Sequence, residues 1–491
     1  MATNAREWNP SRFAARLVVA IAAIVLILAV PARAAELPKR PNIILVMTDD
    51  QGYGELACHG NPIVKTPNLD RLSRQSVRFT DFQVSPTCAP TRSSLMTGRH
   101  EFRSGVTHTI EERERLSLKA TTIAQVLKSA GYATGIFGKW HLGDEDAYQP
   151  ERRGFDEVFI HGAGGIGQTY PGSCGDAPGN TYFNPAILHN GKFEKTQGFC
   201  TDVFFAQALR WIDQQRAGPA PFFAYITPNA PHAPYVCPEQ YSKPYLEAGL
   251  KPDAAAYYGM ITNIDDNMGR LVAALDDWKL DNQTLLIFMT DNGHPMRNLY
   301  NAGMHGTKGT AYEGGTHVPA FFRWTGALPA GVDIKRLAGA IDLFPTFAAL
   351  AGAEIPAGIQ LEGRSLVPLL NNPQADWPDR MLFVHKGRWP KGQAAASKYA
   401  DCAVRNSRFR LVNNKELYDI QQDPGETRNV IDKYPEVVAA MRAAYDRWWN
   451  EVLPAMENED AVGPKVNPFK ARYWRQFGGG PDEGTGTKGS D

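Results

Sequence analysis

One cysteine begins a segment that combines a nucleophile with groups able to bind an anion. Residues 88–99 read CAPTRSSLMTGR, so Pro90 suits the first turn of a helix, and Arg92 lies four residues after the thiol of Cys88. The start of a helix offers unpaired N–H groups and the positive end of its dipole to an oxyanion. The guanidinium of Arg92 can contact two oxygens of a tetrahedral anion. The pattern therefore suggests attack on a sulfate or phosphate ester, although a lone cysteine is equally often a small buried hydrophobe.

Acidic and amide side chains follow two predicted strands. Asp49 and Asp50 come directly after the apolar run 42–48, and Asp291 and Asn292 closely follow the run 285–289. Their oxygens are hard ligands that suit calcium or magnesium, and the set lacks the thiolate or imidazole cluster that zinc prefers. One such pair alone is more often a turn or a helix cap. Two pairs at strand ends, each with glycine close behind, predict a metal site.

Three short motifs supply cations and groups for proton transfer. They are GKWH at 138–141, PHAP at 231–234 and GTKG at 306–309. His141 and His232 are candidate proton-transfer groups, and Lys139 and Lys308 are candidate ligands for ester oxygens. Taken singly, each motif has an ordinary explanation as a solvated turn or a structural histidine.

The elements that must position these residues alternate between strands and helices. This alternation predicts an α/β fold with a large, mainly parallel or mixed sheet between helical layers. In such sheets ligands gather beyond the carboxyl ends of the strands, which is where Asp49, Lys139 and Asp291 lie. The predicted strands are 42–48, 132–137, 222–226, 285–289 and 319–324; the predicted helices begin at 66 or span 121–130, 202–214, 254–278 and 342–351.

The pattern changes at about residue 360. Short strands at 381–386, 402–405, 409–412 and 417–420, followed by a helix at 434–452, predict a smaller C-terminal subdomain of antiparallel sheet plus helix. We divide the chain into a signal peptide (1–34), a catalytic α/β domain (35–358), this subdomain (359–453) and a polar tail (454–491). The end of the tail is expected to be disordered.

The N-terminus predicts export. Arg6, Arg12 and Arg16 precede the apolar run 17–30, which is followed by the cleavage-site pattern ARA at 32–34. The run is too short to favour a stable membrane span, although a retained N-terminal anchor is the alternative. We expect an exported protein, periplasmic or secreted, with no stable membrane span after cleavage.

Composition narrows the class of partner. The chain has 491 residues, of which 43% are hydrophobic and 21% charged, as in an ordinary globular protein with an ample core. Its formal net charge is zero, and it shows no basic stripe, internal repeat or nucleic-acid motif. We therefore expect no nucleic-acid partner.

Taken in order, the motifs resemble those of type I sulfatases, the arylsulfatase-like members of the alkaline phosphatase superfamily. The resemblance runs from Arg40 to about Trp449. Its landmarks are DDxG at 49–52, CxPxR with TGR at 88–99, GKxH at 138–141, PH at 231–232, DNG at 291–293, Lys308, and LYDI with DPGE at 417–426. The first six of these landmarks, found together in the same order, are far more specific than any one of them.

This resemblance implies a cofactor and a modified residue. The ion would be calcium, with magnesium as the alternative, and a separate maturation enzyme would convert Cys88 into formylglycine (3-oxoalanine). The implied metal ligands are Asp49, Asp50, Asp291, Asn292 and residue 88. Arg92 would support the modified residue, while Lys139, His232 and Lys308 would bind the substrate. The family also places a polar residue after the lysine–histidine motif, and none is assigned within 162–168.

Formylglycine, unlike a thiol, allows the sulfated enzyme to release sulfate and turn over. Attack by the thiol would yield a thiosulfate ester with no easy route to turnover, whereas an aldehyde hydrate carries two hydroxyls on one carbon. One hydroxyl, with its pKa lowered by the metal, attacks sulfur while the alcohol leaves. The second hydroxyl is then deprotonated, and sulfate is expelled as the aldehyde returns. We expect His232, aided by Lys308, to protonate the leaving oxygen and His141 to serve the second step.

Other questions stay open from the sequence. The same site could hydrolyse phosphoesters or phosphonate monoesters, and a degenerate site would make the chain a secreted binding protein. The natural substrate (a sulfated glycan or a small aryl or alkyl sulfate), exo or endo action and the oligomeric state are not determined. Five aromatic residues could line a cleft for rings or pack in the core: Tyr170, Tyr182, Phe183, Tyr235 and Trp389.

Export would also permit disulfides. If Cys88 is converted, five of the six cysteines remain, so at least one cannot pair within the chain. Cys174 and Cys200 flank a glycine-rich excursion, and this pair is as readily a disulfide as two free thiols. The connectivity among Cys58, Cys174, Cys200, Cys237 and Cys402 is otherwise open.

Overall fold

The computed structural model describes Met1 and residues 36–480. Apart from Met1, the predicted signal peptide lies outside the described residues, as does the end of the predicted tail. Residues 38–480 belong to one compact unit. No helix within residues 36–480 has both the length and the apolar character that crossing a bilayer requires.

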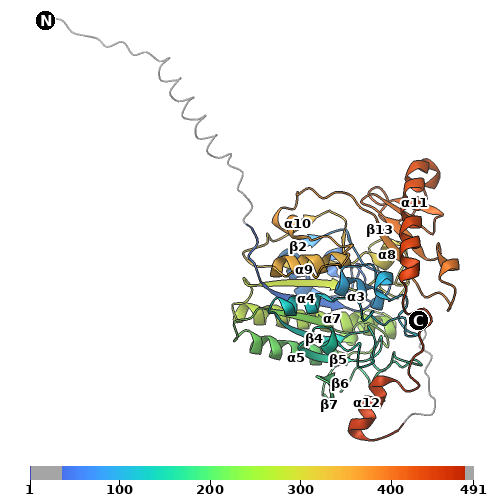
Figure 1. Ribbon diagram of the computed structural model, residues 1–491. Coiled ribbons are helices and arrows are strands. Elements are labelled where there is room, and N and C mark those ends of the chain that lie inside the picture. Colours follow the sequence, from blue (N-terminus) through green and yellow to red (C-terminus); the bar gives the residue numbers. More distant parts are fainter. Residues whose placement is uncertain (2–35, 481–491) are drawn as a thin grey trace. The chain divides into compact units, whose positions relative to one another are not determined.

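Within the described residues, ten strands form one mixed sheet, which confirms the predicted architecture (Figure 1). Their order is β11-β2-β10-β9-β1-β8-β4-β5-β6-β7, and the strands from β9 to β5 run parallel. These strands are nearly continuous runs of buried residues because helices cover both faces of the sheet. The parallel strands are β9 (Thr284–Thr290), β1 (Asn42–Thr48), β8 (Phe222–Thr227), β4 (Ala133–Lys139) and β5 (Glu157–His161).

Antiparallel pairs at both ends make the sheet mixed. β10 is antiparallel to β9 and β2, and β6 is antiparallel to β5 and β7, whereas β11 is parallel to β2. A separate short parallel pair joins β12 to β3. The bounds are β2 (Val77–Phe79), β3 (Phe82–Gln83), β6 (Ala186–His189), β7 (Lys192–Lys195), β10 (Ala320–Arg323), β11 (Val332–Ile334) and β12 (Ala338–Gly339).

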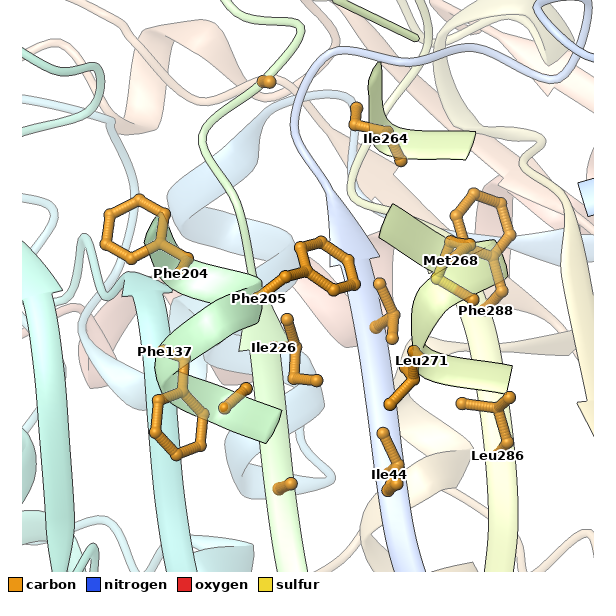
Figure 2. Close-up of a cluster of buried hydrophobic side chains, with 14 of the residues drawn as sticks. Ile44, Phe137, Phe204, Phe205, Ile226, Ile264, Met268, Leu271, Leu286 and Phe288 are labelled. Atoms are coloured by element: carbon orange, nitrogen blue, oxygen red, sulfur yellow. The ribbon is translucent and has the colours of Figure 1, made fainter. Parts of the chain in front are cut away.

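Helices pack on each face because strand side chains alternate between the two faces. On one face Phe205 of α5 and Leu271 of α7 belong to the same buried cluster as Ile44 of β1, as Figure 2 shows. On the other face the ring of Phe223 lies 5.8 Å from that of Phe347 in α9. The helices of these layers are α2 (Pro67–Arg74), α3 (Cys88–Thr97), α4 (Ile123–Ser129), α5 (Cys200–Gln215), α6 (Glu239–Glu247), α7 (Pro252–Asp277) and α9 (Leu343–Ala351).

A separate antiparallel sheet follows, as predicted. Its four strands lie in chain order, and α11 packs on one side of them through Trp448 and Trp449. The predicted polar tail also contains a helix, α12, whose Phe469 is buried against Phe193 of β7. The bounds are β13 (Leu382–His385), β14 (Cys402–Arg405), β15 (Phe409–Val412), β16 (Glu416–Asp419), α8 (Glu313–Thr316), α10 (Val367–Asn371), α11 (Pro435–Val452) and α12 (Pro468–Phe477).

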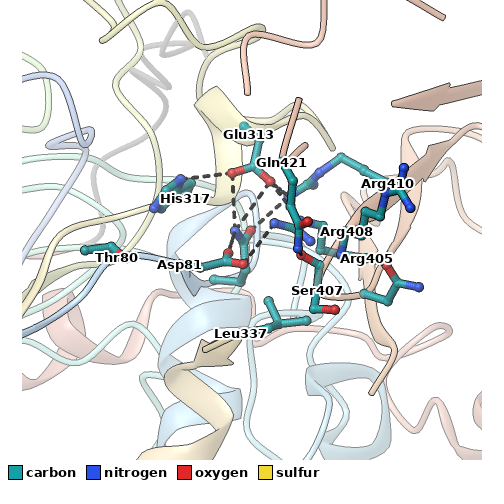
Figure 3. A network of polar contacts seen from close by, with 12 residues as sticks. Thr80, Asp81, Glu313, His317, Leu337, Arg405, Ser407, Arg408, Arg410 and Gln421 are labelled. Carbon is teal, nitrogen blue, oxygen red and sulfur yellow. Dashed lines mark hydrogen bonds and ion pairs between the residues drawn. The ribbon is translucent and has the colours of Figure 1, made fainter. Parts of the chain in front are cut away.

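A buried ionic cluster joins the C-terminal sheet to the segment that follows Lys308 (Figure 3). The carboxylate of Glu313 accepts hydrogen bonds from Arg405 (3.0 Å) and Arg410 (2.6 Å), and Arg410 also donates to the carbonyl of Ala311 (2.7 Å). Burial alone would raise the pKa of Glu313, but the two guanidinium charges lower it well below its ordinary value. Removing one partner would leave an uncompensated buried charge, so the cluster holds this segment against β14 and β15.

The structure contradicts a disulfide between Cys174 and Cys200, since all six cysteines are free. The thiol of Cys200 donates to Oδ1 of Asn229 at 2.9 Å, and that of Cys174 approaches the carbonyl of Thr109 at 3.7 Å. Both thiols are buried, each with its own acceptor, as expected for a small hydrophobe with a weak donor.

Candidate active site

The predicted metal ligands and cations meet at the carboxyl edge of the parallel strands. Thr48 at the end of β1 pairs in register with Thr290 at the end of β9, so Asp49 and Asp291 emerge side by side. The N–H of Asp291 donates to the carbonyl of Thr48 at 3.1 Å. β4 ends at Lys139 two strands from β1, which brings its side chain to the same edge.

Cys88 is the first residue of α3, and all ten residues of this helix are buried. Pro90 lies in the first turn, as the sequence predicts, and Gly98 ends the helix in the left-handed region with φ of 64°. Burial raises the pKa of the Cys88 thiol, while the charges of Lys139 and Lys308 act in the opposite direction without cancelling it. The unmodified thiol is therefore neutral at pH 7 and a weak nucleophile.

Arg92 fastens this helix to the strand ends. One terminal nitrogen donates to Oδ2 of Asp291 at 2.7 Å, and the other donates to the carbonyl of Lys139 (2.9 Å) and the hydroxyl of Thr227 (2.6 Å). Because both terminal nitrogens already have protein partners, the side chain positions residue 88 more readily than it binds an ester directly. Thr227, at the end of β8, contacts Arg92 and was not singled out by the sequence analysis.

The two lysines each pair with one aspartate. Nζ of Lys139 lies 2.6 Å from Oδ2 of Asp49, and Nζ of Lys308 lies 3.0 Å from Oδ2 of Asp50. Burial disfavours the charged form of Lys308, but the carboxylate of Asp50 more than offsets it and raises the pKa of the lysine. Both cations are therefore held at the strand edge in their charged form.

Several oxygens at this edge fit a hard cation. Oδ1 of Asp49 and Oδ1 of Asn292 are buried and have no hydrogen-bond partner within residues 36–480. Ligand atoms of Asp49, Asp50 and His232 all lie within 4.8 Å of one another. Asp291 is more engaged, since its oxygens accept from Arg92 and from the N–H of Asp50 (3.1 Å), although carboxylate oxygens can accept further bonds.

Two of the three carboxylates also need more positive charge than the lysines and Arg92 supply. The third is Asp50, where burial would raise the pKa but the charge of Lys308 and its other neighbours lowers it. Burial raises the pKa of Asp49, and burial together with the charge of Asp49 raises that of Asp291 to about 7. A divalent ion would favour the ionised form of both groups. The donor set, which is oxygen-rich and short of compensating charge, fits calcium or magnesium.

Both candidate histidines present one nitrogen for proton transfer. Nδ1 of His232 donates to the carbonyl of Ala233 (2.8 Å), which leaves the lone pair on Nε2, 3.7 Å from Oδ2 of Asp50. Nε2 of His141 donates to the carbonyl of Thr109 (2.7 Å), and its Nδ1 has no hydrogen-bond partner among the described residues. Burial lowers the pKa of His232 to about 4 and that of His141 well below its ordinary value.

A glycine-rich loop packs directly on these two imidazoles. A Cβ added at Gly164 would lie 2.8 Å from Cε1 of His141, and one at Gly165 would lie 2.8 Å from Nδ1 of His232. Only glycine fits such close approaches without displacing the rings. The same loop brings Gln168 to the cleft, which supplies a polar residue where the sequence analysis assigned none.

The site opens into a cleft of about 430 Å³ that contains Asp50, His232 and Lys308. Of the five aromatic candidates, Tyr235 lines this cleft, whereas Tyr182 and Trp389 are buried in core clusters. The lining residues that the sequence analysis missed are Thr87, Gln168, Pro295, Arg297, Thr310, Lys386 and Arg388, whereas Ala233, Thr307 and Gly309 belong to the motifs that it named. The basic KGR stretch at 386–388, which begins at the last residue of the predicted strand 381–386, was the available signal for two of the missed residues.

Comparison with known proteins matches both parts of the chain. A family model described as Sulfatase matches residues 41–353, and one described as N-sulphoglucosamine sulphohydrolase, C-terminal, matches residues 303–448. Human arylsulfatase A is 33% identical over 456 residues, covering 82% of this chain and 86% of the human protein. N-acetylgalactosamine-6-sulfatase from Canis lupus familiaris is 32% identical over 382 residues, covering 72% of this chain and 70% of the canine protein.

A solved structure extends the similarity to the fold. The crystal structure of Ps i-CgsB in complex with k-i-k-neocarrahexaose has a TM-score of 0.76 and 28% identity, covering 89% of this chain and 97% of that chain. The family model spans well over half of this chain, and the human relative covers most of both proteins. The chain thus belongs to the sulfatase family and is a type I sulfatase of the alkaline phosphatase superfamily.

Proposed function

We propose that this sulfatase cleaves organic sulfate monoesters, aryl or carbohydrate, to an alcohol and inorganic sulfate, with formylglycine at position 88 and calcium as the ion. One observation carries the proposal: Cys88 begins a buried helix at the strand edge where Lys139, Lys308 and His232 converge. The neutral thiol there is a poor nucleophile, which favours conversion to a more reactive group. Export of the chain and its maturation by a separate enzyme stay predictions.

The ion-binding residues have a defined task in this proposal. Asp49, Asp50, Asp291 and Asn292 would hold the ion together with the oxygen of residue 88. When bound, the ion would lower the pKa of a hydroxyl on that residue and offset charge on the ester oxygens. Magnesium is the alternative ion for the same oxygen ligands.

The cations would bind the sulfate group and keep residue 88 in place. Lys139 and Lys308 form ion pairs with Asp49 and Asp50, and these pairs favour the protonated form of each lysine. Both lysines can therefore contact ester oxygens as cations. Arg92 would act through position rather than contact, because its terminal nitrogens bind Asp291 and the ends of two strands.

The two histidines would transfer protons, each through one ring nitrogen. His232 would take up a proton from solvent at Nε2 and donate it to the leaving oxygen, since the bond from Nδ1 to Ala233 fixes the ring and leaves Nε2 facing the site. The charge of Asp50 favours the protonated ring against the larger effect of burial. His141 would accept a proton at Nδ1 when the second hydroxyl of residue 88 is deprotonated, because Nε2 is already engaged.

Replacing His232 by alanine should therefore lower kcat most for esters with a poor leaving group. We expect kcat on a sugar or alkyl sulfate to fall by about 100- to 10,000-fold, the range of general acid–base catalysis. An ester of 4-nitrophenol needs little protonation on leaving, and its kcat should fall only about 10-fold. The measurement is kcat across aryl sulfates whose phenols differ in pKa.

A matched histidine provides the control for this series. His189 on β6 pairs with Glu157 at 2.8 Å and does not line the cleft, so His189→Gln should follow the wild-type dependence on leaving group. An equal loss for His232→Ala on all leaving groups would show that His232 positions the substrate instead of donating a proton.

Comparing sulfate with phosphorus esters tests the proposed reaction. With protein whose residue 88 has been verified by peptide mass spectrometry, kcat/KM for 4-nitrophenyl sulfate should exceed that for 4-nitrophenyl phosphate by about 100-fold or more, about 3 kcal/mol. A phosphonate monoester of the same phenol completes the set. The opposite preference would replace sulfate ester hydrolysis with phosphoester or phosphonate hydrolysis at the same site.

A further inference from the structure

The cleft holds more positive charge than one sulfate group needs. Its lining includes Arg297, Lys308, Lys386 and Arg388, while Asp50 is the one acidic residue among the described residues that line it. Asp50 is already paired with Lys308 at 3.0 Å. In the proposed function, the scissile sulfate is bound by Lys308, Lys139 and the ion. That function assigns no role to the other three cations of the cleft, Arg297, Lys386 and Arg388.

Two of these cations come from the C-terminal segment and are held there by main-chain contacts. The N–H of Lys386 donates to the carbonyl of Asp401 (2.9 Å), and that of Arg388 donates to the carbonyl of Thr107 (3.0 Å). Arg388 adopts a left-handed conformation with φ of 59°, a strained choice for a residue with a side chain. Main-chain hydrogen bonds to the C-terminal subdomain and to the catalytic part therefore hold the backbone of Lys386 and Arg388 in place.

Lys386 lies next to the sulfate-binding lysine. A Cβ added at Gly309, the neighbour of Lys308, would lie 3.8 Å from Cε of Lys386. Lys386 also forms an ion pair with Asp401 at 3.5 Å, where the lysine and aspartate side chains are 32% and 56% exposed. Such an exposed pair contributes little and can yield to an incoming anion.

We propose that Lys386 and Arg388, assisted by Arg297, bind a second anionic group of the substrate. The preferred substrate is then a saccharide sulfate that carries a further sulfate or carboxylate near the scissile group. The guanidinium of Arg388 suits two oxygens of such a group, and Tyr235 offers an aromatic side chain in the same cleft. This inference rests on the proposed function, because it takes Lys308 as a ligand of the scissile sulfate.

Competition against turnover of 4-nitrophenyl sulfate tests the sulfate case. The two competitors are N-acetylglucosamine 6-sulfate and glucosamine 2-N,6-O-disulfate, which differ by one anionic group. We expect the disulfate to inhibit the wild-type enzyme at an about 10-fold or more lower concentration. This advantage should shrink as ionic strength rises from about 0.02 to about 0.3 M, because part of it acts between exposed charges.

The variant Lys386→Gln/Arg388→Gln should reduce the advantage of the disulfate to within about 3-fold. Lys415→Gln is the matched control, because Lys415 is exposed on the same subdomain and does not line the cleft. A second comparison tests whether a carboxylate is recognised, with 2-carboxy-4-nitrophenyl sulfate and 4-nitrophenyl sulfate as the two substrates. The ratio of kcat/KM values should fall in the double variant if a carboxylate is also recognised.

Equal inhibition by the two sugars, or a full advantage retained in the double variant, would overturn the inference. If the modified wild-type enzyme turns over no sulfate ester, the proposed function fails instead. Calorimetric titration of the same two sugars then tests the second anion site by itself, with the same about 10-fold ratio expected for wild type and its loss expected in the double variant. Equal affinities would again overturn it.

Discussion

Replacing Cys88 by alanine is expected to lower kcat on any sulfate ester by about 10,000-fold or more while leaving the fold intact. The residue would be the only source of the nucleophile, so neither Lys139 nor His232 could substitute for it. Its side chain is small and starts a helix held by Arg92, so truncation should cost only about 1 kcal/mol of stability. Steady-state kinetics and thermal unfolding measure the two effects.

The matched control is Cys58→Ala, because Cys58 is an exposed free thiol that does not line the cleft. It should retain wild-type turnover. Cys88→Ser separates two explanations, since it keeps a hydroxyl but fails if the maturation enzyme needs a thiol. Appreciable turnover by Cys88→Ala, or an unaltered thiol at position 88 in fully active exported protein, would contradict the formylglycine mechanism.

Removal of the metal should have the second largest effect. A chelator is expected to lower kcat/KM by about 100-fold or more, because metal activation of a nucleophile contributes several kcal/mol. The unfolding temperature should also fall, since an ion present at about 100 times its Kd adds about 3 kcal/mol of stability. Adding calcium should restore both, and titrating magnesium beside it identifies the ion that binds more tightly.

Asn292→Ala tests the ligand set without changing charge. It removes Oδ1, a buried oxygen with no hydrogen-bond partner in the described part of the chain, and should raise the calcium concentration for half-maximal activity by about 10-fold or more. Asn282→Ala is the control, because Asn282 is exposed near the opposite end of β9. Full activity in chelated protein that contains no bound metal would rule out the metal site.

The central strands and main helices were predictable because their signals are local. The apolar run that forms β1 and the Thr66-Pro67 pair at the start of α2 act over a few residues, so β1 was predicted with its observed bounds and the start of α2 within one position. The edge strands β6 and β7 and the helix α12 were missed. Phe193 and Phe469 bury each other although more than half of the chain's length separates them, and no residue next to either one predicts such a pairing.

Whether Cys174 and Cys200 form a disulfide stayed open in the sequence for a related reason. Cys174 and Cys200 are separated by a loop that the sequence describes only by composition, whereas a bridge depends on the distance and direction of two side chains. In the folded chain each thiol has its own acceptor, Thr109 and Asn229. The signal peptide, the domain limits and the roles assigned to single residues stay predictions.

What the sequence by itself determined is the chemistry at the ends of the parallel strands. Asp49, Lys139 and Asp291 sit at the ends of buried strands, and parallel strands must end at a common edge, so local patterns were enough to bring them together. Only the tertiary structure decided what else faces the substrate. Lys386 and Arg388 reach the cleft because a buried ionic cluster docks the C-terminal sheet beside Lys308, and such docking depends on contacts between distant segments.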